Sequence, residues 1–119
     1  MFAGWGMDWL QVALGGAVGS VARHAIGLAL AGLAPLGTLA VNLLGCALIG
    51  WLHGRLGQVA PERLLLMTGF CGGFTTWSAF GLETIRLGNE GRVGAAAAYA
   101  AVTVVLCLAA VAAGWALAR

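Results

Sequence analysis

Four long apolar stretches, separated by short polar joints, make up most of the chain. They cover roughly residues 10–32, 36–54, 62–86 and 93–117. Each approaches or exceeds the about 20 mainly apolar residues that a helix needs to cross a bilayer. Glycine, proline and polar residues mark the joints, at 32–35, 54–61 and 88–91. The pattern therefore predicts an all-α membrane protein with four transmembrane helices, in which consecutive helices are antiparallel neighbours.

The third stretch contains a segment that is a poor continuous helix. Residues 69–81 read Gly-Phe-Cys-Gly-Gly-Phe-Thr-Thr-Trp-Ser-Ala-Phe-Gly. The adjacent glycines each weaken a helix interior by about 1 kcal/mol relative to alanine, and the hydroxyls that follow can cap a new helix start. We therefore expect the third helix to be broken near its middle. Because irregular backbone at membrane depth is tolerated only when it is buried in protein or lines a wet cavity, the break suggests a site for ions or small polar solutes.

The composition excludes an ordinary soluble domain. Of the 119 residues, 61% are hydrophobic and 8% are charged, whereas about a quarter of the residues in soluble domains are charged. We expect one membrane domain over residues 1–119, with no soluble module. The net charge is only +2 and there is no lysine, so no basic patch for nucleic acid is indicated. The three cysteines have no paired spacing and indicate neither a disulfide framework nor a zinc site.

The first apolar stretch is not expected to be a cleavable leader. Residues 29–31 resemble a signal-peptide cleavage site, but the preceding segment lacks a basic start and carries Arg23 and His24 within its apolar part. We expect the N-terminus to belong to the mature domain.

The arginines give almost no bias in membrane orientation. One face of the membrane would carry the N-terminus with Arg55, Arg63 and Arg119, and the other face would carry Arg86 and Arg92. So weak a preference allows insertion in both orientations, after which inverted copies could pair. A single fixed orientation stays open as the alternative at this point.

Polar and small residues recur every four positions in three of the stretches, which places each set on one helix face. The sets are Gly15, Gly19, Arg23 and Gly27; Thr38, Asn42, Cys46 and Gly50; and Tyr99, Thr103 and Cys107. The small residues of the first set allow close helix approach, and its arginine should point into protein or a vestibule because a lipid-facing charge is costly. The other two sets form tracks of hydrogen-bond donors inside apolar helices.

Several of these polar residues have a structural and a functional interpretation. Asn42 could join helices, which is a common role of membrane asparagine, or donate to a permeating anion. Thr103 could satisfy itself on the carbonyl one turn back. The rings of Trp77 and Phe80 could simply pack, yet aromatic edges carry partial positive charge that can help to hold an anion. Glu83 could face a vestibule or lie at the membrane interface.

Taken together, these residues resemble the CrcB/Fluc family of fluoride channels over nearly the whole chain. The matching pieces are Gly15-Gly-Ala-Val-Gly-Ser-Val-Ala-Arg23, Gly37-Thr-Leu-Ala-Val-Asn42-Leu-Leu-Gly45, Gly69 to Phe80 running on to Glu83, and the track of Tyr99, Thr103 and Cys107. The piece at 69–80 and the Gly-Thr-Leu-x-x-Asn element are the most specific. The resemblance implies an antiparallel, dual-topology homodimer with two fluoride pathways, in a prokaryotic plasma (inner) membrane.

The resemblance also implies roles for single residues. Asn42 would be the pore amide, and Trp77 and Phe80 would occupy the two aromatic positions of the pore. The further pore-lining residues would be Tyr99, Thr103, Cys107, Thr38 and Ser78. Charged positions near the vestibules would be Arg23 and Glu83. A structural sodium ion at the dimer centre would be held by the backbone carbonyls of Gly72 and Thr75.

Two of these positions depart from the family pattern. Trp77 stands where phenylalanine is usual, and its ring is larger but keeps a positive edge and adds an N–H donor. Cys107 stands where a hydroxyl is common, and a thiol is a weaker donor.

The predicted function is passive fluoride efflux that lowers the fluoride concentration of the cytoplasm. No nucleophile, base or metal cluster indicates an enzyme. One alternative is a small multidrug-type, proton-coupled exporter, which would need a membrane-embedded glutamate that the first stretch lacks. A second alternative is a non-transporting scaffold subunit, which would explain the glycines but not the aligned donors.

Overall fold

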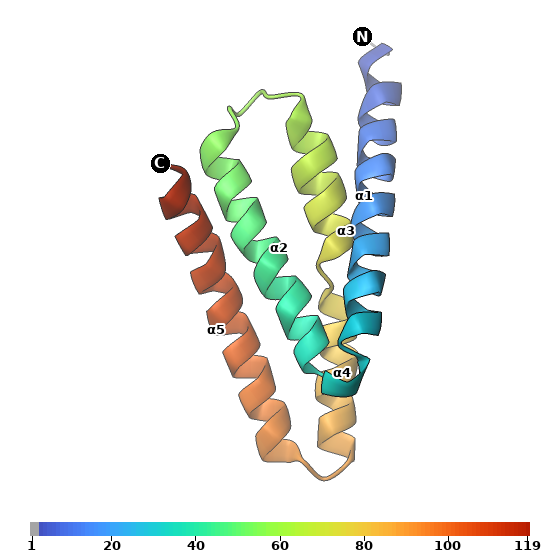
Figure 1. Cartoon of the computed structure of the whole chain (residues 1–119), viewed down its shortest axis with the longest axis vertical. Coiled ribbons are helices and arrows are strands. Elements are labelled where there is room, and N and C mark those ends of the chain that lie inside the picture. Colours follow the sequence, from blue (N-terminus) through green and yellow to red (C-terminus); the bar gives the residue numbers. More distant parts are fainter. Residues whose placement is uncertain (1–2) are drawn as a thin grey trace.

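The computed structural model describes the backbone of residues 3–119 and the side chains of residues 6–119. The described chain contains helices and turns but no strand. Its elements are α1 (Ala3–Ala29), η1 (Ala31–Leu33), α2 (Leu36–Arg55), η2 (Leu64–Cys71), α3 (Gly72–Phe74), α4 (Trp77–Asn89) and α5 (Val93–Ala118). Figure 1 shows them as an elongated bundle, whose longest dimension is 54 Å. This length exceeds the roughly 30 Å hydrocarbon core of a bilayer.

The predicted spans correspond to four arms of the bundle, with shifted ends. Within the described chain, three helices are long and apolar enough to cross a membrane: Gly6–Ala29, Leu36–Arg55 and Val93–Ala118. The remaining arm, which corresponds to the third predicted span, is divided among η2, α3 and α4. The first helix was predicted to reach residue 32 but ends at Ala29, because the chain tightens into the 3₁₀ turn η1 ahead of Pro35. The all-helical membrane architecture is confirmed.

The break predicted in the third span lies at Thr75 and Thr76, whose ψ angles of 157° and 115° are extended. The first half ends where the carbonyl of Cys71 accepts from both the N–H and the hydroxyl of Thr75, at 3.0 and 2.9 Å. The second half begins where the Thr76 hydroxyl accepts from the Ala79 N–H at 3.1 Å. This is an N-cap, so the hydroxyls that follow the glycines start the new helix as expected.

Close packing of α1 on the first half of the broken arm depends on glycine. A side chain at Gly15 would collide with the backbone carbonyl of Leu65, and one at Gly19 with that of Phe70. Gly27, in the same predicted stripe, has open space around its Cα. Among the glycines of this stripe, Gly15 and Gly19 therefore allow close backbone approach, whereas Gly27 does not take part in it.

The helices α2 and α5 are parallel and lie side by side (Figure 1). Gly50 packs on the backbone carbonyl of Val111, and Gly114 packs on that of Ala47. These contacts fix the register between the two helices. As a result, the four-residue donor stripes predicted separately in the second and fourth spans face each other across one interface.

A tight turn brings α4 back against α5. The N–H groups of Gly91 and Arg92 donate to the carbonyls of Gly88 and Leu87, at 3.1 and 3.0 Å, and Gly91 has a φ of 79°. This is the Schellman pattern, in which glycine takes the left-handed position after a helix. The turn places the polar residues of α4 beside those of α5.

Candidate functional site

A cavity of about 450 Å³ lies beside the break, between α2, the broken arm and α5. It gathers many of the residues predicted to form a site: Asn42, Gly72, Thr75, Trp77, Phe80, Thr103 and Cys107. These residues come from three arms of the bundle. The spatial cluster therefore follows from the parallel register of α2 and α5 and from the position of the break.

Asn42 is 8% exposed and bridges α2 to the break. Its Nδ2 donates to the Thr76 carbonyl at 3.1 Å, and its Oδ1 accepts from the Thr76 N–H at 2.7 Å. The structure thus shows the helix-joining role that the sequence left open. A primary amide has two N–H donors, and within the described chain only one of them has a partner. The second remains for a ligand in the cavity.

Thr103 supplies a buried hydroxyl without a protein partner. The residue is 4% exposed, and its Oγ1 makes no hydrogen bond within the described chain. The bond to the carbonyl one turn back, which threonine often makes, does not form here, whereas Thr84 does bond to the Phe80 carbonyl at 2.8 Å. Leaving a buried polar group unsatisfied costs about 1–3 kcal/mol. Because Thr103 is one of the residues that line the cavity, a ligand there would be within reach of this orphan hydroxyl after a small side-chain rotation.

Aromatic rings continue the wall of the cavity. The ring of Trp77 lies 5.0 Å from that of Phe80, and the ring of Phe80 lies 5.4 Å from that of Tyr99, each pair tilted by 49°. Phe80 is buried, whereas Trp77 is 75% exposed in the single chain. Tilted rings present positive edges as well as negative faces. Phe70 and Phe74 instead stack on each other at 12° as packing.

Glu83 joins three helices, a role that the sequence did not predict. Its Oε1 accepts from the Thr38 hydroxyl and its Oε2 accepts from the Tyr99 hydroxyl, both at 2.8 Å. The carboxylate is half-buried among α2, α4 and α5. In this arrangement the hydroxyl protons of Thr38 and Tyr99 are already donated, so these two residues offer no free donor to an anion.

Arg23 points toward the break. Its Nε donates to the Gly73 carbonyl at 3.1 Å, and the Ser20 hydroxyl donates to the same oxygen at 3.4 Å. Arg23 and Thr38 also line a second cavity of about 200 Å³. Ser78 is exposed, with its Oγ 3.3 Å from the Thr76 Oγ1, and it lines neither cavity.

The carbonyl end of the first half-helix is the part of the site that suits a cation. No hydrogen bond between described residues ends on the backbone oxygens of Gly72 or Thr75. Free carbonyls at a helix C-terminus carry partial negative charge, and such ends coordinate cations in broken membrane helices. Among the described residues no group of three histidine, cysteine or acidic side chains could hold a metal. The ligands available at this position are therefore backbone carbonyl oxygens.

Comparison with known proteins gives consistent results. The family model described as CrcB-like protein, Camphor Resistance (CrcB), matches residues 10–115. A protein of Paracoccus denitrificans is 47% identical, over 89% of this chain and 90% of its own length. One of Rhizobium johnstonii is 51% identical over 92% and 94%, and one of Methylobacillus flagellatus is 48% identical over 83% and 84%. Each of these relatives is named a fluoride-specific ion channel, FluC.

Proposed function

Because this chain belongs to the CrcB-like protein family, we propose that it conducts fluoride passively across the membrane through the cavity beside the break. The protein is a multi-pass membrane channel and not an enzyme. The alternative of a proton-coupled exporter finds no support among its relatives. Passive efflux would lower the fluoride concentration of a prokaryotic cytoplasm, with the channel in the plasma (inner) membrane.

The observation that carries the pore assignment is the hydroxyl of Thr103, which is buried without a partner in the part of the chain that the structure describes. Thr103 lines the same cavity as Phe80 and Asn42, and the second amide donor of Asn42 has no partner among the described residues. Fluoride is small and strongly hydrated, so a pore has to replace its water with several short donors. Neutral donors bind the ion less tightly than a fixed positive charge and therefore let it leave again.

The aromatic edges of Trp77 and Phe80 supply the remaining attraction. Their tilted rings stand on the cavity wall beside Asn42 and Thr103. Ring edges carry partial positive charge without a tightly held proton. Cys107 extends the path by a weak thiol donor, and the hydroxyls of Tyr99 and Thr38 join it only when they turn away from Glu83.

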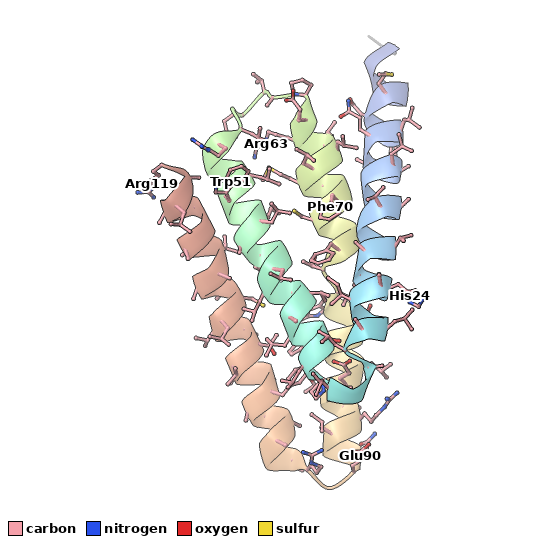
Figure 2. The ribbon with its side chains drawn as sticks, viewed as in Figure 1. His24, Trp51, Arg63, Phe70, Glu90 and Arg119 are labelled. Carbon is pink, nitrogen blue, oxygen red and sulfur yellow. The ribbon has the colours of Figure 1, made fainter. Side chains whose placement is uncertain are left out.

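The functional unit in this proposal is an antiparallel, dual-topology homodimer. In a single chain the ring of Trp77 is highly exposed. In the proposed dimer a second copy would pack over the break, cover this ring and complete the pore wall. Arg55, Arg63 and Arg119 lie at one end of the bundle, where Figure 2 labels Arg63 and Arg119. Arg86 and Arg92 flank the turn between α4 and α5 at the other end. Such balance favours insertion in both orientations.

Sodium at the centre of this dimer would be held by the carbonyls of Gly72 and Thr75. Both oxygens are free of protein hydrogen bonds within the described chain, and a hard cation prefers oxygen ligands. The ion would neutralise the carbonyl end of the half-helix. Its role is structural, and no step of conduction requires it.

Fluoride efflux from proteoliposomes that contain only this protein tests the proposal. Asn42→Asp places a negative charge beside the path, and Phe80→Ala removes the buried ring, so both variants should lose most of the fluoride flux. Chloride-loaded vesicles serve as the control for leak. Unchanged flux in both variants would defeat the assignment of the pore to this cavity.

A further inference from the structure

Two thiols face each other where α2 packs on α5. Cys46 and Cys107 both line the 450 Å³ cavity and are each half-buried. Cys46 belongs to α2 and Cys107 to α5, and they are separated in sequence by the same offset as Gly50 and Val111, which pack on each other. They stand one helical turn beyond Asn42 and Thr103, which line the same cavity.

The separation of the two thiols is set by contacts on both sides of them. One turn further along, Gly50 packs on the backbone carbonyl of Val111. Two turns earlier, Thr38 and Tyr99 share the carboxylate of Glu83. The same offset in sequence separates the members of each of these pairs, so the two helices keep one register over the whole segment. The thiols are therefore preorganised and do not depend on a loop to bring them together.

The chemistry of this pair favours soft cations. Both cysteines are free thiols, and thiolates select soft metals, whereas hard ions prefer oxygen. Ions such as Cu⁺, Ag⁺ and Hg²⁺ are satisfied by two thiolates in a linear arrangement, so the lack of a three-residue ligand group among the described residues does not count against them. The thioether of Met67 lines the same cavity and adds a soft surface.

We propose that Cys46 and Cys107 form a two-thiolate site for a soft, thiophilic cation. With mercuric chloride as the probe, each thiol loses its proton to water and forms one sulfur–mercury bond, and the two chlorides leave. No electron is transferred, so the step needs no oxidant. Because the site adjoins Asn42 and Thr103, the bound metal also obstructs the proposed fluoride path; that second part rests on the proposed function.

Metal retention by the purified, reduced protein tests the site itself. The protein is mixed with one equivalent of mercuric chloride, washed with excess glutathione to strip mercury from single thiols, and weighed by native mass spectrometry. One mercury per chain should remain in the natural protein and in Cys71→Ser, a buried cysteine of the same cavity. Retention should be lost in Cys46→Ser and in Cys107→Ser. Retention by either of these variants, or loss from Cys71→Ser, would overturn the pairing.

A second measurement uses the unaltered chain and does not depend on how a variant folds. After mercury treatment the thiols are labelled with a maleimide and mapped by peptide mass. Cys46 and Cys107 should be protected together, and the label should return after dithiothreitol. Labelling of either one at full extent contradicts the site.

Measurements of fluoride flux test the position of the metal site and the proposed function separately. In proteoliposomes, mercuric chloride should lower the flux of the natural protein several-fold, and dithiothreitol should restore it. After a wash with excess glutathione, which strips mercury from single thiols, the flux of Cys46→Ser, relative to its own untreated value, should not change, whereas the natural protein should stay inhibited. Mercury that is retained without any loss of flux would overturn the placement of the site beside the path. Absence of fluoride flux before any metal is added would count against the proposed function and leave the retention result standing.

Discussion

The side-chain amide of Asn42 forms a two-point bridge to the backbone of Thr76. Its Oδ1 accepts from the Thr76 N–H at 2.7 Å and its Nδ2 donates to the Thr76 carbonyl at 3.1 Å. Thr76 has an extended conformation and forms no helical hydrogen bond of its own at either group. The bridge therefore satisfies both backbone groups exposed by the break, and it fixes α4 relative to α2.

Replacement of Asn42 by alanine should destabilise the protein. Both backbone groups of the half-buried Thr76 would lose their partner, and a fully buried unsatisfied group costs about 1–3 kcal/mol, which is an upper bound for each of them. Thermal unfolding in detergent should show a clear drop in the midpoint for Asn42→Ala. The matched control is Ser78→Ala, at an exposed hydroxyl two residues beyond Thr76, which should unfold close to the natural protein. An equal midpoint in Asn42→Ala would show that the bridge contributes nothing to stability.

Tyr99→Phe should weaken the contact between α4 and α5. The change removes a 2.8 Å hydrogen bond to the carboxylate of Glu83 and leaves the ring beside Phe80 in place. Hydrogen bonds to charged groups contribute about 1.5–3 kcal/mol, and partial exposure of Glu83 reduces the effect toward the lower end of that range.

The measurement for Tyr99→Phe is again thermal unfolding, with Thr84→Val as its control. Among the described residues the hydroxyl of Thr84 bonds only to the Phe80 carbonyl within its own helix, so its removal should have little effect. In a double-mutant cycle with Glu83→Gln, the two changes should be non-additive because they share one bond. Additive losses would mean that Tyr99 and Glu83 are not coupled.

Gly19→Ala should prevent α1 from docking on the broken arm. A methyl group at this position would collide with the backbone carbonyl of Phe70, which cannot move aside as a flexible side chain could. Overpacking of this kind costs about 1–3 kcal/mol or more. Gly27→Ala is the matched control, because it lies in the same helix and the same stripe but has open space around it.

The expected results for the two glycines are opposite in sign. Gly19→Ala should lower the yield of folded protein and its unfolding midpoint. Gly27→Ala should be neutral or stabilising, since alanine is favoured over glycine in a helix interior by about 1 kcal/mol. Equal behaviour of the two variants in size-exclusion chromatography and thermal unfolding would contradict the packing of α1 described above.

Much of the fold could be predicted from one-dimensional patterns. The apolar stretches gave the four arms, and the glycines followed by hydroxyls gave the break at Thr75 and Thr76. The four-residue spacing gave the stripes of α2 and α5. Each of these features depends on residues near one another in sequence, where periodicity and capping preferences act directly.

The partners across helices could not be predicted in the same way. The bonds from Asn42 to Thr76, and from Thr38 and Tyr99 to Glu83, depend on how far one helix is shifted along another. That shift is set by close contacts such as Gly50 on Val111, and periodicity within a single helix carries no information about it. In the sequence, successive members of the donor stripe of α2 are separated by a constant number of residues from successive members of the stripe of α5. This constant separation indicates that the stripes pair only once α2 and α5 are known to be parallel neighbours.

Thr103→Val should separate stability from conduction. Valine has nearly the shape of threonine but lacks the hydroxyl, and in this chain that hydroxyl is buried without a partner among the described residues. Its removal relieves the cost of an unsatisfied polar group, about 1–3 kcal/mol. The unfolding midpoint of Thr103→Val should therefore equal or exceed that of the natural protein.

The same substitution should lower fluoride flux, because the ion loses one of the donors that replace its water. Thr103→Ser keeps the hydroxyl and should conduct better than the valine variant, although it loses a methyl group from the packed wall. Flux in proteoliposomes and unfolding in detergent, measured on the same preparations, give the two readouts. A stable Thr103→Val channel with natural flux would mean that the orphan hydroxyl does not face the ion, and the path would then have to avoid this side of the cavity.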